Sequence, residues 1–178
     1  KILENEDEKL LLAKIGTVLI GGGTIDKHIE AELKNFPNHI YSTYGMTETL
    51  SHIALRRISG ESASQWYTPM PQVHVELSKE NTLIITAPHL SITLLKTNDI
   101  AELNEKGEFR ILGRTDNTIN TGGIKIQIED IEHLLHQTGL TDFLITSALD
   151  KTYGETIVLL TISRSTAKIK SAIATLPK

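Results

Sequence analysis

The chain has 178 residues, of which 39% are hydrophobic and 22% charged, and its formal net charge is -4. This composition is that of an ordinary globular protein, long enough to bury a core in one domain or slightly more. The mild acidity and the lack of a basic run argue against a nucleic-acid partner. The absence of cysteine excludes disulfides and thiolate metal sites and is compatible with a reducing cytoplasm, and the apolar runs are too short to span a membrane.

The first residues predict a helix and a strand. Residues 1 to 14 are rich in charge and favour a helix. Its apolar face would carry three leucines, Leu3, Leu10 and Leu11. The apolar run 17–20 predicts a short strand that ends at Gly21-Gly22-Gly23.

A second helix and a second strand are predicted after these glycines. Three apolar residues have the spacing of one helix face: Ile25, Ile29 and Leu33. Either Thr24 or Asp26 can cap this helix. Residues 40–43 predict the next strand. The order strand, helix, strand indicates a parallel unit.

Short strands and turns dominate the region after residue 57. Strands are predicted over 73–77 and 83–86, separated by a polar turn, and over 101–103 and 109–112. The last two flank Asn104-Glu105-Lys106-Gly107, which is a hairpin signal. This pattern predicts a small antiparallel sheet or barrel.

The region from Gly113 onward predicts a small α+β unit with two or three strands and two helices on one face. Ile119 and the alternating Ile124, Ile126 and Ile128 flank a hairpin turn at Thr121-Gly122-Gly123. A helix over about 129–137 would bury Ile131, Leu134 and Leu135 and stop at Gly139. Strands 143–148 and 157–162 follow. Ser165 would cap a last helix that ends at Pro177.

The segment Tyr44-Gly45-Met46-Thr47-Glu48 follows a predicted strand, at the place where α/β sheets bind ligands. Gly45 permits a tight turn, and Tyr44 offers a ring that can stack on a base. Thr47 offers donors to a phosphate, and Glu48 offers an oxygen ligand to Mg²⁺. The glycines at 21–23 offer bare backbone to a ring or phosphate. Taken alone, each segment is better explained as a plain turn.

A longer set of residues repeats a known spacing: Asp99, Gly107, Gly113, Arg114, Asp116, Gly122, Gly123, Ile126 and Asp130-Ile131-Glu132. With the complete Tyr-Gly-x-Thr-Glu match, this set resembles the nucleotide-handling motifs of the adenylate-forming acyl-CoA synthetases. The chain departs from the family pattern at four positions. They are Asn98, Asn117, Asn120 and Ile128, which stand where Gly, Asp, Lys and Pro are common.

The resemblance implies a role for each matched residue. Thr47 and Glu48 would be catalytic, with Glu48 as the Mg²⁺ ligand. ATP or CoA would contact Gly21, Gly22, Gly23, Tyr44, Gly45, Met46, Thr47, Asp99, Arg114, Gly122 and Gly123. Within this set, Asp99 and Arg114 would bind the ribose, and Gly122-Gly123 would line the pantetheine tunnel. Asp116 would be the hinge, and Ser51 and His52 would enter the acyl pocket.

The resemblance also implies a fold and a domain organisation. Residues 1–115 would be the C-terminal part of a large α/β AMP-binding domain that ends in a small antiparallel unit. Residues 116–178 would be the hinge and most of a small, mobile α+β domain, truncated before the catalytic lysine. We expect the phosphate loop to precede Lys1 and the lysine to follow Lys178, so that the chain is the middle-to-late part of an enzyme.

The implied function is that of an ATP-dependent, AMP-forming ligase that adenylates a carboxylic acid and transfers the acyl group to CoA. Segments 44–57 and 67–73 look most like the o-succinylbenzoate–CoA ligases of menaquinone synthesis. Two alternatives stay open: an adenylation domain that loads a carrier protein, or, for this chain alone, an inactive AMP-binding module. The expected partners are ATP, Mg²⁺, CoA and a small carboxylic acid in the cytoplasm, and a homo-oligomer is compatible with this reading.

Overall fold

The computed structural model describes residues 2–176. Its contacts divide the chain into two compact units. The first unit comprises Lys1–Thr97 and Ala101–Ile111, and the second comprises Asn98–Ile100 and Leu112–Lys178. Both units combine helices with sheets, which confirms the predicted fold class. The domain division predicted after residue 115 stays a prediction.

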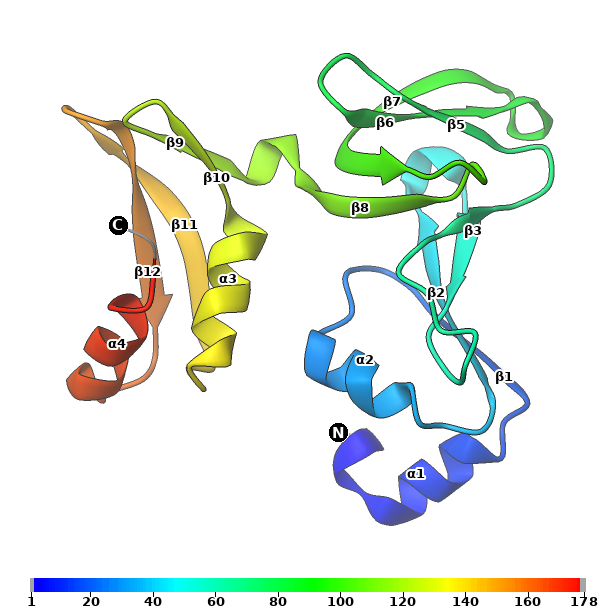
Figure 1. Ribbon diagram of the computed structural model, residues 1–178, viewed down its shortest axis with the longest axis horizontal. Helices are drawn as coiled ribbons and strands as arrows, with labels where there is room; N and C mark the ends of the chain where they lie inside the picture. Colours follow the sequence, from blue (N-terminus) through cyan, green and yellow to red (C-terminus); the bar gives the residue numbers. More distant parts are fainter. Residues whose placement is uncertain (1, 177–178) are drawn as a thin grey trace. The chain divides into compact units, whose positions relative to one another are not determined.

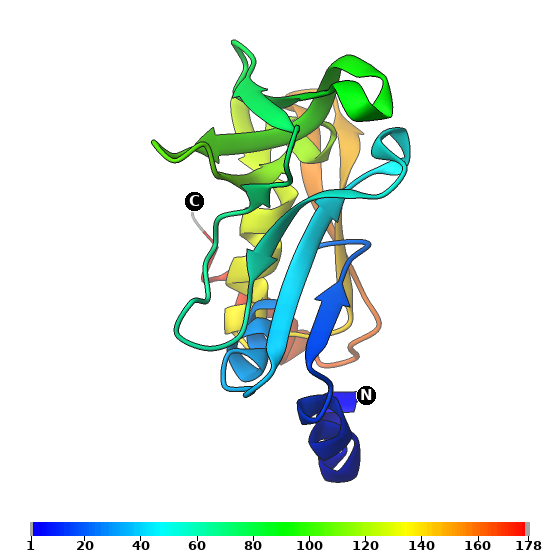
Figure 2. The same ribbon diagram turned by 90° about the vertical axis from the view of Figure 1, so that its right-hand side faces the viewer.

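A four-stranded sheet with the order β1-β2-β3-β4 opens the first unit (Figure 1). Strand β1 (Thr17–Ile20) is parallel to β2 (His39–Gly45), and β3 (His52–Arg57) and β4 (Thr68–Pro69) continue the sheet in antiparallel fashion. Figure 2 shows β1 (blue) and β2 (cyan) running side by side in the same direction. The predicted parallel strand–helix–strand unit is therefore confirmed. Strand β3 was not predicted.

The helix expected over residues 1 to 14 is interrupted at Asn5, whose side chain accepts hydrogen bonds from the backbone N–H of Asp7 and Glu8. This cap separates η1 (Ile2–Glu4) from α1 (Glu6–Ala13). The predicted apolar face is wrong in part, because Leu10 and Leu11 are 61% and 62% exposed. The leucines that pack against the buried cluster of Leu33, Ile40 and Ile58 are Leu3 and Leu12.

Helix α2 (Lys27–Leu33) is shorter than its apolar spacing suggested. Asp26 is its cap, since its Oδ1 accepts from the N–H of His28 at 2.8 Å and of Ile29 at 3.3 Å. Of the three residues predicted to share one face (Ile25, Ile29 and Leu33), Leu33 is the one that lies in α2 and is buried. Ile25 packs from the preceding loop and Ile29 is 45% exposed.

A second four-stranded sheet has the order β5-β6-β7-β8 and belongs to the first unit except for Asn98–Ile100 of β7 and the end of β8 from Leu112. Its strands are β5 (His74–Leu77), β6 (Thr82–Ala87), β7 (Ile92–Leu103) and β8 (Phe109–Arg114). The predicted strand at 101–103 is the end of the long β7. The core on this sheet gathers Ile53, Ala54, Val73, Leu83, Ile85, Ala87, Ala101 and Phe109, so it joins β3 of the first sheet to the second sheet.

The second unit contains four strands, where two or three were expected, in the order β10-β9-β12-β11. They are β9 (Thr118–Thr121), β10 (Ile124–Gln127), β11 (Phe143–Asp150) and β12 (Gly154–Thr161). The predicted hairpin around Gly122-Gly123 is present, and the predicted strands 143–148 and 157–162 pair as a second hairpin over 143–161. A short turn of helix, η4 (Thr115–Asn117), precedes them.

Two helices pack on this sheet, α3 (Ile128–Gln137) and α4 (Thr166–Ile173) (Figure 1). They share a core with the strands, formed by Ile119, Ile131, Leu135, Leu140, Ile145 and Ala172. Gly139 follows the C-cap with a φ of 74°, and Ser165 caps α4, both as predicted. Pro177 lies outside the described residues. No helix in the part of the chain described here has the length and apolarity to cross a membrane.

Candidate functional site

The glycine turn lies against strand β2 at the carboxyl edge of the parallel pair. Because Ile20 pairs with Ser42, Gly21 leaves β1 beside the last residues of β2. A Cβ atom on Gly21 would collide with Oγ1 of Thr43, and Gly22 has a φ of 95°, a conformation that favours glycine. The structure therefore brings the glycine turn next to the strand that carries Tyr44 and Gly45.

Gly45 stands where β2 turns back toward β3. A Cβ atom there would collide with the carbonyl oxygen of Ser51 and lie 2.7 Å from Cα of His52. Both are backbone atoms, so a side chain at position 45 would have to push the two strands apart. A register shift between Tyr44 and Gly45 marks the same place. The close approach of the strands accounts for this glycine, while its contact with a nucleotide stays a prediction.

The ring of Tyr44 belongs to an aromatic cluster. Its centroid lies 5.0 Å from that of Phe109 in an edge-on contact and 5.9 Å from that of Tyr67. Such contacts fix the orientation of a ring. Tyr44 is only half-buried, so the ring is held by the core and still reaches the surface. Its predicted stacking on a base fits this position.

Thr49 fixes the loop that carries Thr47 and Glu48, and sequence reasoning assigned it no role. The side chain is buried, with 1% exposed. Its Oγ1 accepts from the N–H of Met46 at 3.0 Å and lies 2.9 Å and 2.7 Å from the carbonyl oxygens of Met46 and Ser51. The hydroxyl thus closes the turn η2 (Thr47–Thr49) from inside. The sequence signal for this role was a threonine three residues after the residue that begins the turn, because its hydroxyl can bond the backbone of that residue.

Thr47 and Glu48 both point to the surface. Among the described residues, no cluster of three or more His, Asp or Glu side chains could hold a metal ion by protein groups alone. Mg²⁺ bound with a nucleotide takes only one or two protein carboxylates, because phosphates and water complete its shell. The single exposed carboxylate of Glu48 fits such a site, and its role stays a prediction.

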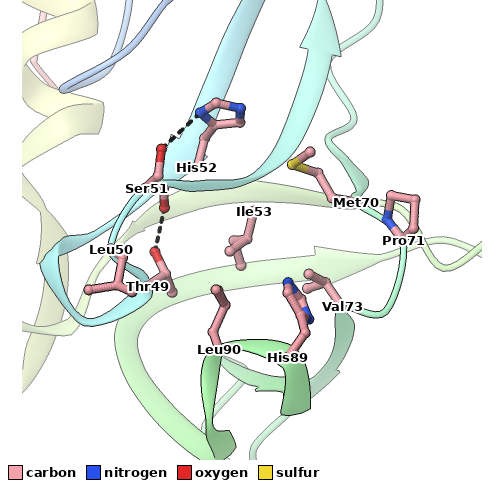
Figure 3. A pocket seen from close by; sticks show the side chains of 10 residues that line it. All are labelled: Thr49, Leu50, Ser51, His52, Ile53, Met70, Pro71, Val73, His89 and Leu90. Atoms are coloured by element: carbon pink, nitrogen blue, oxygen red, sulfur yellow. Dashed lines mark hydrogen bonds between the residues drawn. The ribbon is translucent and has the colours of Figure 1, made fainter.

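Ser51 and His52 line a pocket of about 190 Å³ in the first unit (Figure 3). The other lining residues are Thr49, Leu50, Ile53, Met70, Pro71, Val73, His89 and Leu90. Ser51 Oγ and His52 Nδ1 are 3.2 Å apart. Most of the lining is apolar, and the polar groups are few. This arrangement suits an apolar ligand with a polar end. His89 was not predicted from the sequence.

Three strained turns border this pocket. Leu50, Gln72 and Ser91 have φ values of 60°, 67° and 61°, although none is glycine. Each lies in or beside a segment that lines the pocket. Left-handed backbone at such residues costs about 1–3 kcal/mol and clusters at binding sites. The strain therefore supports a functional reading of the pocket.

A chain of charged groups links three predicted residues in the second unit. Arg114 Nη1 donates to Asp99 Oδ1 at 2.9 Å, and Arg114 Nε and Nη2 donate to Asp116 Oδ1 and Oδ2 at 2.8 Å and 2.7 Å. The Asp99 side chain is 8% exposed, whereas those of Arg114 and Asp116 are 45% and 48% exposed. The guanidinium of Arg114 holds the pKa of Asp116 below its usual range.

The Gly122-Gly123 turn lies against Tyr153. Its φ values are 58° and 84°, as a tight hairpin turn requires. The N–H of Gly122 donates to the carbonyl of Tyr153 at 2.8 Å, and a Cβ on Gly122 would lie 3.3 Å from the Tyr153 ring. The described contacts of this turn are thus with the β11–β12 turn, and its predicted role in holding pantetheine stays a prediction.

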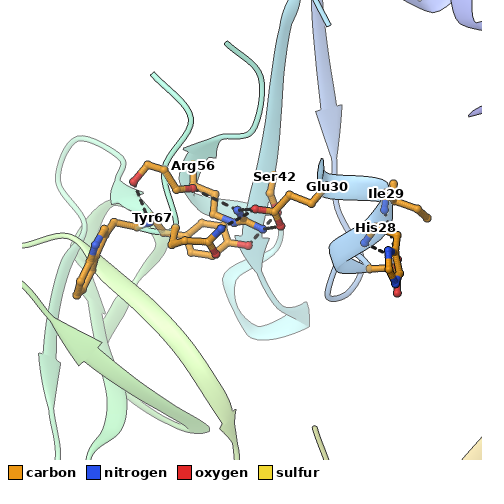
Figure 4. Close-up of polar contacts among 10 residues, drawn as sticks. His28, Ile29, Glu30, Ser42, Arg56 and Tyr67 are labelled. Atoms are coloured by element: carbon orange, nitrogen blue, oxygen red, sulfur yellow. Dashed lines mark hydrogen bonds and ion pairs between the residues drawn. The ribbon is translucent and has the colours of Figure 1, made fainter. Parts of the chain in front are cut away.

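A largely buried ion pair that sequence reasoning missed supports the first unit (Figure 4). Arg56 Nη1 and Nη2 each donate to one oxygen of Glu30 at 2.7 Å, and the side chains are 7% and 18% exposed. Arg56 also lies over the Tyr67 ring, whose hydroxyl is 2.8 Å from Ser42 Oγ. The pair ties α2, which follows the glycine turn, to β3, which follows the Tyr44 motif. The Arg56 hydrogen bonds lower the pKa of Glu30.

Known proteins resemble this chain in sequence and in fold. No family model matches the chain. The chain is similar to the 2-succinylbenzoate–CoA ligase of Listeria monocytogenes serotype 4b (strain F2365), with 25% identity over 175 residues that cover 85% of this chain and 36% of that ligase. It is also similar to the acyl-CoA synthetase (AMP-forming)/AMP-acid ligase II-like protein of Dyadobacter fermentans DSM 18053. That structure matches with a TM-score of 0.61 and 28% identity, over 97% of this chain and 51% of that chain.

The o-succinylbenzoate CoA synthetase of Bacillus subtilis shares the fold in two states. Its complex with the acyl-adenylate intermediate matches with a TM-score of 0.71 and 18% identity, over 97% of this chain and 44% of that chain. Its complex with ATP and magnesium ion matches with a TM-score of 0.67, 18% identity and the same coverage. The resemblance to the AMP-forming acyl-CoA synthetases is confirmed in sequence and fold. The chain spans about a third of the curated relative and about half of the solved structures.

Proposed function

We propose that this chain carries part of the nucleotide and acyl sites of an AMP-forming acid–thiol ligase, which adenylates a carboxylic acid with ATP and transfers the acyl group to CoA. The observation that supports this most is the carboxyl edge of β1 and β2. There the glycine turn and the Tyr44 motif, which lie over twenty residues apart in the sequence, come together. This edge is where α/β sheets bind ligands.

The proposed roles follow from position and chemistry. The bare backbone of Gly21–Gly23 and the ring of Tyr44 would receive the adenine, and the donors of Thr47 would face the phosphates. Asp99 and Arg114 would bind the ribose hydroxyls, since a carboxylate accepts from both hydroxyls and a guanidinium donates. Glu48 would hold Mg²⁺, which neutralises phosphate charge as pyrophosphate leaves. The Gly122-Gly123 turn would border the pantetheine arm of CoA in the second step.

The acyl substrate that we propose is o-succinylbenzoate, an aromatic acid with a second carboxylate. The curated relative is a 2-succinylbenzoate–CoA ligase. The pocket beside the Tyr44 motif is largely apolar and has polar groups from Ser51, His52 and His89. An apolar wall suits the benzene ring, and the hydroxyl and imidazole groups can bind a carboxylate or a keto oxygen. We place the complete enzyme in the cytoplasm, where ATP and CoA are both available.

For the 178-residue chain by itself, we propose weak AMP binding without turnover. The family resemblance assigns a phosphate loop and a catalytic lysine to the reaction, and no segment of this sequence matches either. The chain also covers 36% of the curated relative. A carrier-loading adenylation domain is the alternative for the complete enzyme, and it differs only in the acceptor of the acyl group.

One pair of assays tests the function in the complete enzyme. Acid-dependent exchange of labelled pyrophosphate into ATP measures the first step, and o-succinylbenzoate should support it far better than benzoate or acetate. Formation of o-succinylbenzoyl-CoA then measures the second step with CoA as acceptor. Exchange that no carboxylic acid stimulates would contradict the ligase, whereas exchange without transfer to CoA would favour a carrier protein as acceptor.

A further inference from the structure

The arrangement around Arg114 carries an inference about Asp116 beyond its predicted role as a hinge. An arginine side chain has many rotamers, and its donors recognise a ribose only when the guanidinium plane is fixed. In this structure Nε and Nη2 of Arg114 meet both oxygens of Asp116, at 2.8 Å and 2.7 Å. This is the parallel two-bond geometry that fixes a guanidinium plane. The remaining terminal nitrogen, Nη1, donates to the buried Asp99 at 2.9 Å.

We propose that Asp116 is a positioning residue of the nucleotide site, which holds the guanidinium of Arg114 in the plane that faces Asp99. The inference rests on the proposed function, because it takes Asp99 and Arg114 as the ribose-binding pair. Asp116 touches no substrate in this account. It acts only through Arg114.

The backbone around Asp116 is itself held in place. Thr115 Oγ1 donates to the carbonyl of Asn98 at 3.3 Å, which ties η4 to the residue preceding Asp99. On the other side, Asn117 Nδ2 donates to Glu129 Oε1 at 2.8 Å, which ties η4 to α3. These two hydrogen bonds fix the turn that places the carboxylate of Asp116 next to Arg114. A change of the backbone dihedrals at residue 116 would withdraw the carboxylate, so the ribose site and the conformation of this turn are coupled.

Two effects of removing the Asp116 charge have opposite signs. Asp116→Asn takes a negative charge away from an anionic nucleotide, and this alone would tighten binding slightly. If the carboxylate positions Arg114, the same change frees the guanidinium and weakens binding, by about five-fold for an exposed pair of this kind. The direction of the change in the Kd for AMP therefore separates positioning from simple charge repulsion.

The chain offers a matched control. Glu102 and Arg110 form an ion pair at 2.7 Å whose side chains are 45% and 43% exposed, close to the values for Asp116 and Arg114. Glu102→Gln removes one negative charge and one exposed pair without touching the proposed ribose residues. Asp116→Glu keeps the carboxylate on a longer stem, and we expect it to recover part of the loss.

The experiment measures the Kd for AMP by calorimetry and the Arg114 Nε–H signal by ¹⁵N NMR in the nucleotide-free chain. We expect Asp116→Asn to weaken AMP binding about five-fold and to shift the Arg114 Nε–H signal to that of a free guanidinium, while Glu102→Gln changes neither. Unchanged or tighter AMP binding in Asp116→Asn would overturn the inference.

The NMR readout separates this inference from the proposed function. If the unmodified chain bound no AMP, the proposed function would fail, and the Arg114 signal would still decide the positioning role. A signal that is the same in the unmodified chain and in Asp116→Asn would show that the carboxylate does not order the guanidinium, whatever the chain binds. Circular dichroism of each variant verifies that the fold is retained.

Discussion

The ion pair between Arg56 and Glu30 allows a quantitative test of how the first unit is held together. Arg56→Met keeps most of the side-chain volume but leaves the carboxylate of Glu30 without its counter-charge. The Glu30 side chain is only 18% exposed, and its remaining side-chain partner is Gln65 at 2.8 Å. Removing one partner of a buried pair costs about 3–5 kcal/mol, and the partial exposure of Glu30 puts the expected cost at about 3 kcal/mol. That is a large share of the roughly 5–15 kcal/mol that stabilises a typical domain.

The double variant Arg56→Met/Glu30→Met sharpens this test. Replacing both charges by apolar groups of similar size is often neutral or even stabilising. We therefore expect the double variant to be more stable than Arg56→Met alone, although it changes two side chains instead of one. Urea unfolding followed by tryptophan fluorescence is the assay, because Trp66 is the only tryptophan and lies in the first unit with the pair. A loss below about 1 kcal/mol in the single variant, or a double variant less stable than the single, would refute the reasoning.

The same pair has a pH dependence of known sign. The pKa of Glu30 is lowered in the folded chain by its hydrogen bonds to Arg56. A depressed carboxyl pKa contributes stability above the unfolded value of about 4.3, and this contribution is lost as the pH falls through the folded pKa. The unmodified chain should therefore lose the stability contributed by ionised Glu30 when it is acidified. In Arg56→Met the loss of stability between about pH 5 and lower pH should be shallower.

Three further changes test the loop around the Tyr44 motif. Thr49→Val removes the acceptor of the Met46 N–H in a buried site, and we expect a loss of about 1–3 kcal/mol in urea unfolding; an unchanged midpoint would contradict the role of the hydroxyl. Gly45→Ala meets backbone on β3, so it should destabilise the first unit more than Gly23→Ala, where a Cβ has open space; equal effects would count against the close approach. In the complete enzyme, Glu48→Gln should slow adenylation far more than thioester formation from supplied acyl-adenylate, and equal losses would make Glu48 structural.

Local sequence signals were sufficient where a single element decides its own conformation. The strand β1, the glycine turn, the Asp26 cap and the stop at Gly139 each follow from residues within a few positions. The hairpin at Asn104 is equally local, since its Oδ1 accepts from the N–H of Lys106 and Glu108. For such elements the chemistry of caps and turns is enough.

Features that depend on distant partners were not predictable in this way. Strand β3 lacks an alternating pattern, because Ile53 and Ala54 are adjacent and both buried in the core that this strand shares with the second sheet. Arg56 reads as a surface charge until Glu30, some 26 positions earlier, is seen beside it. Likewise, His89 lines the same pocket as Ser51 and His52 only because the fold brings these segments together. Each of these outcomes depends on packing between segments far apart in the sequence.

Part of the candidate site could be read from the motif match, and the structure adds physical reasons to it. In the sequence, Gly113 was notable only because it matches the family spacing between Asp99 and Glu132. A Cβ at Gly113 would lie 2.8 Å from Oε1 of Gln127, so a side chain there would disturb the start of α3. The contact between Arg114 and Asp116 could not be foreseen, because a separation of two residues in the sequence does not by itself fix a side-chain geometry.

The central claim is that this chain binds an adenine nucleotide through the residues that the family resemblance assigns to ATP, and an AMP titration followed by ¹⁵N NMR tests it most directly. We predict that millimolar AMP shifts the backbone amides of Gly21–Gly23, Gly45–Glu48 and Asp99, together with the Nε–H of Arg114, and that CMP shifts them less. Resonances of α4, which carries no residue assigned to the nucleotide, should stay in place. Saturating AMP that leaves the Tyr44 motif and Asp99 unshifted, or that shifts only other parts of the chain, would contradict the account.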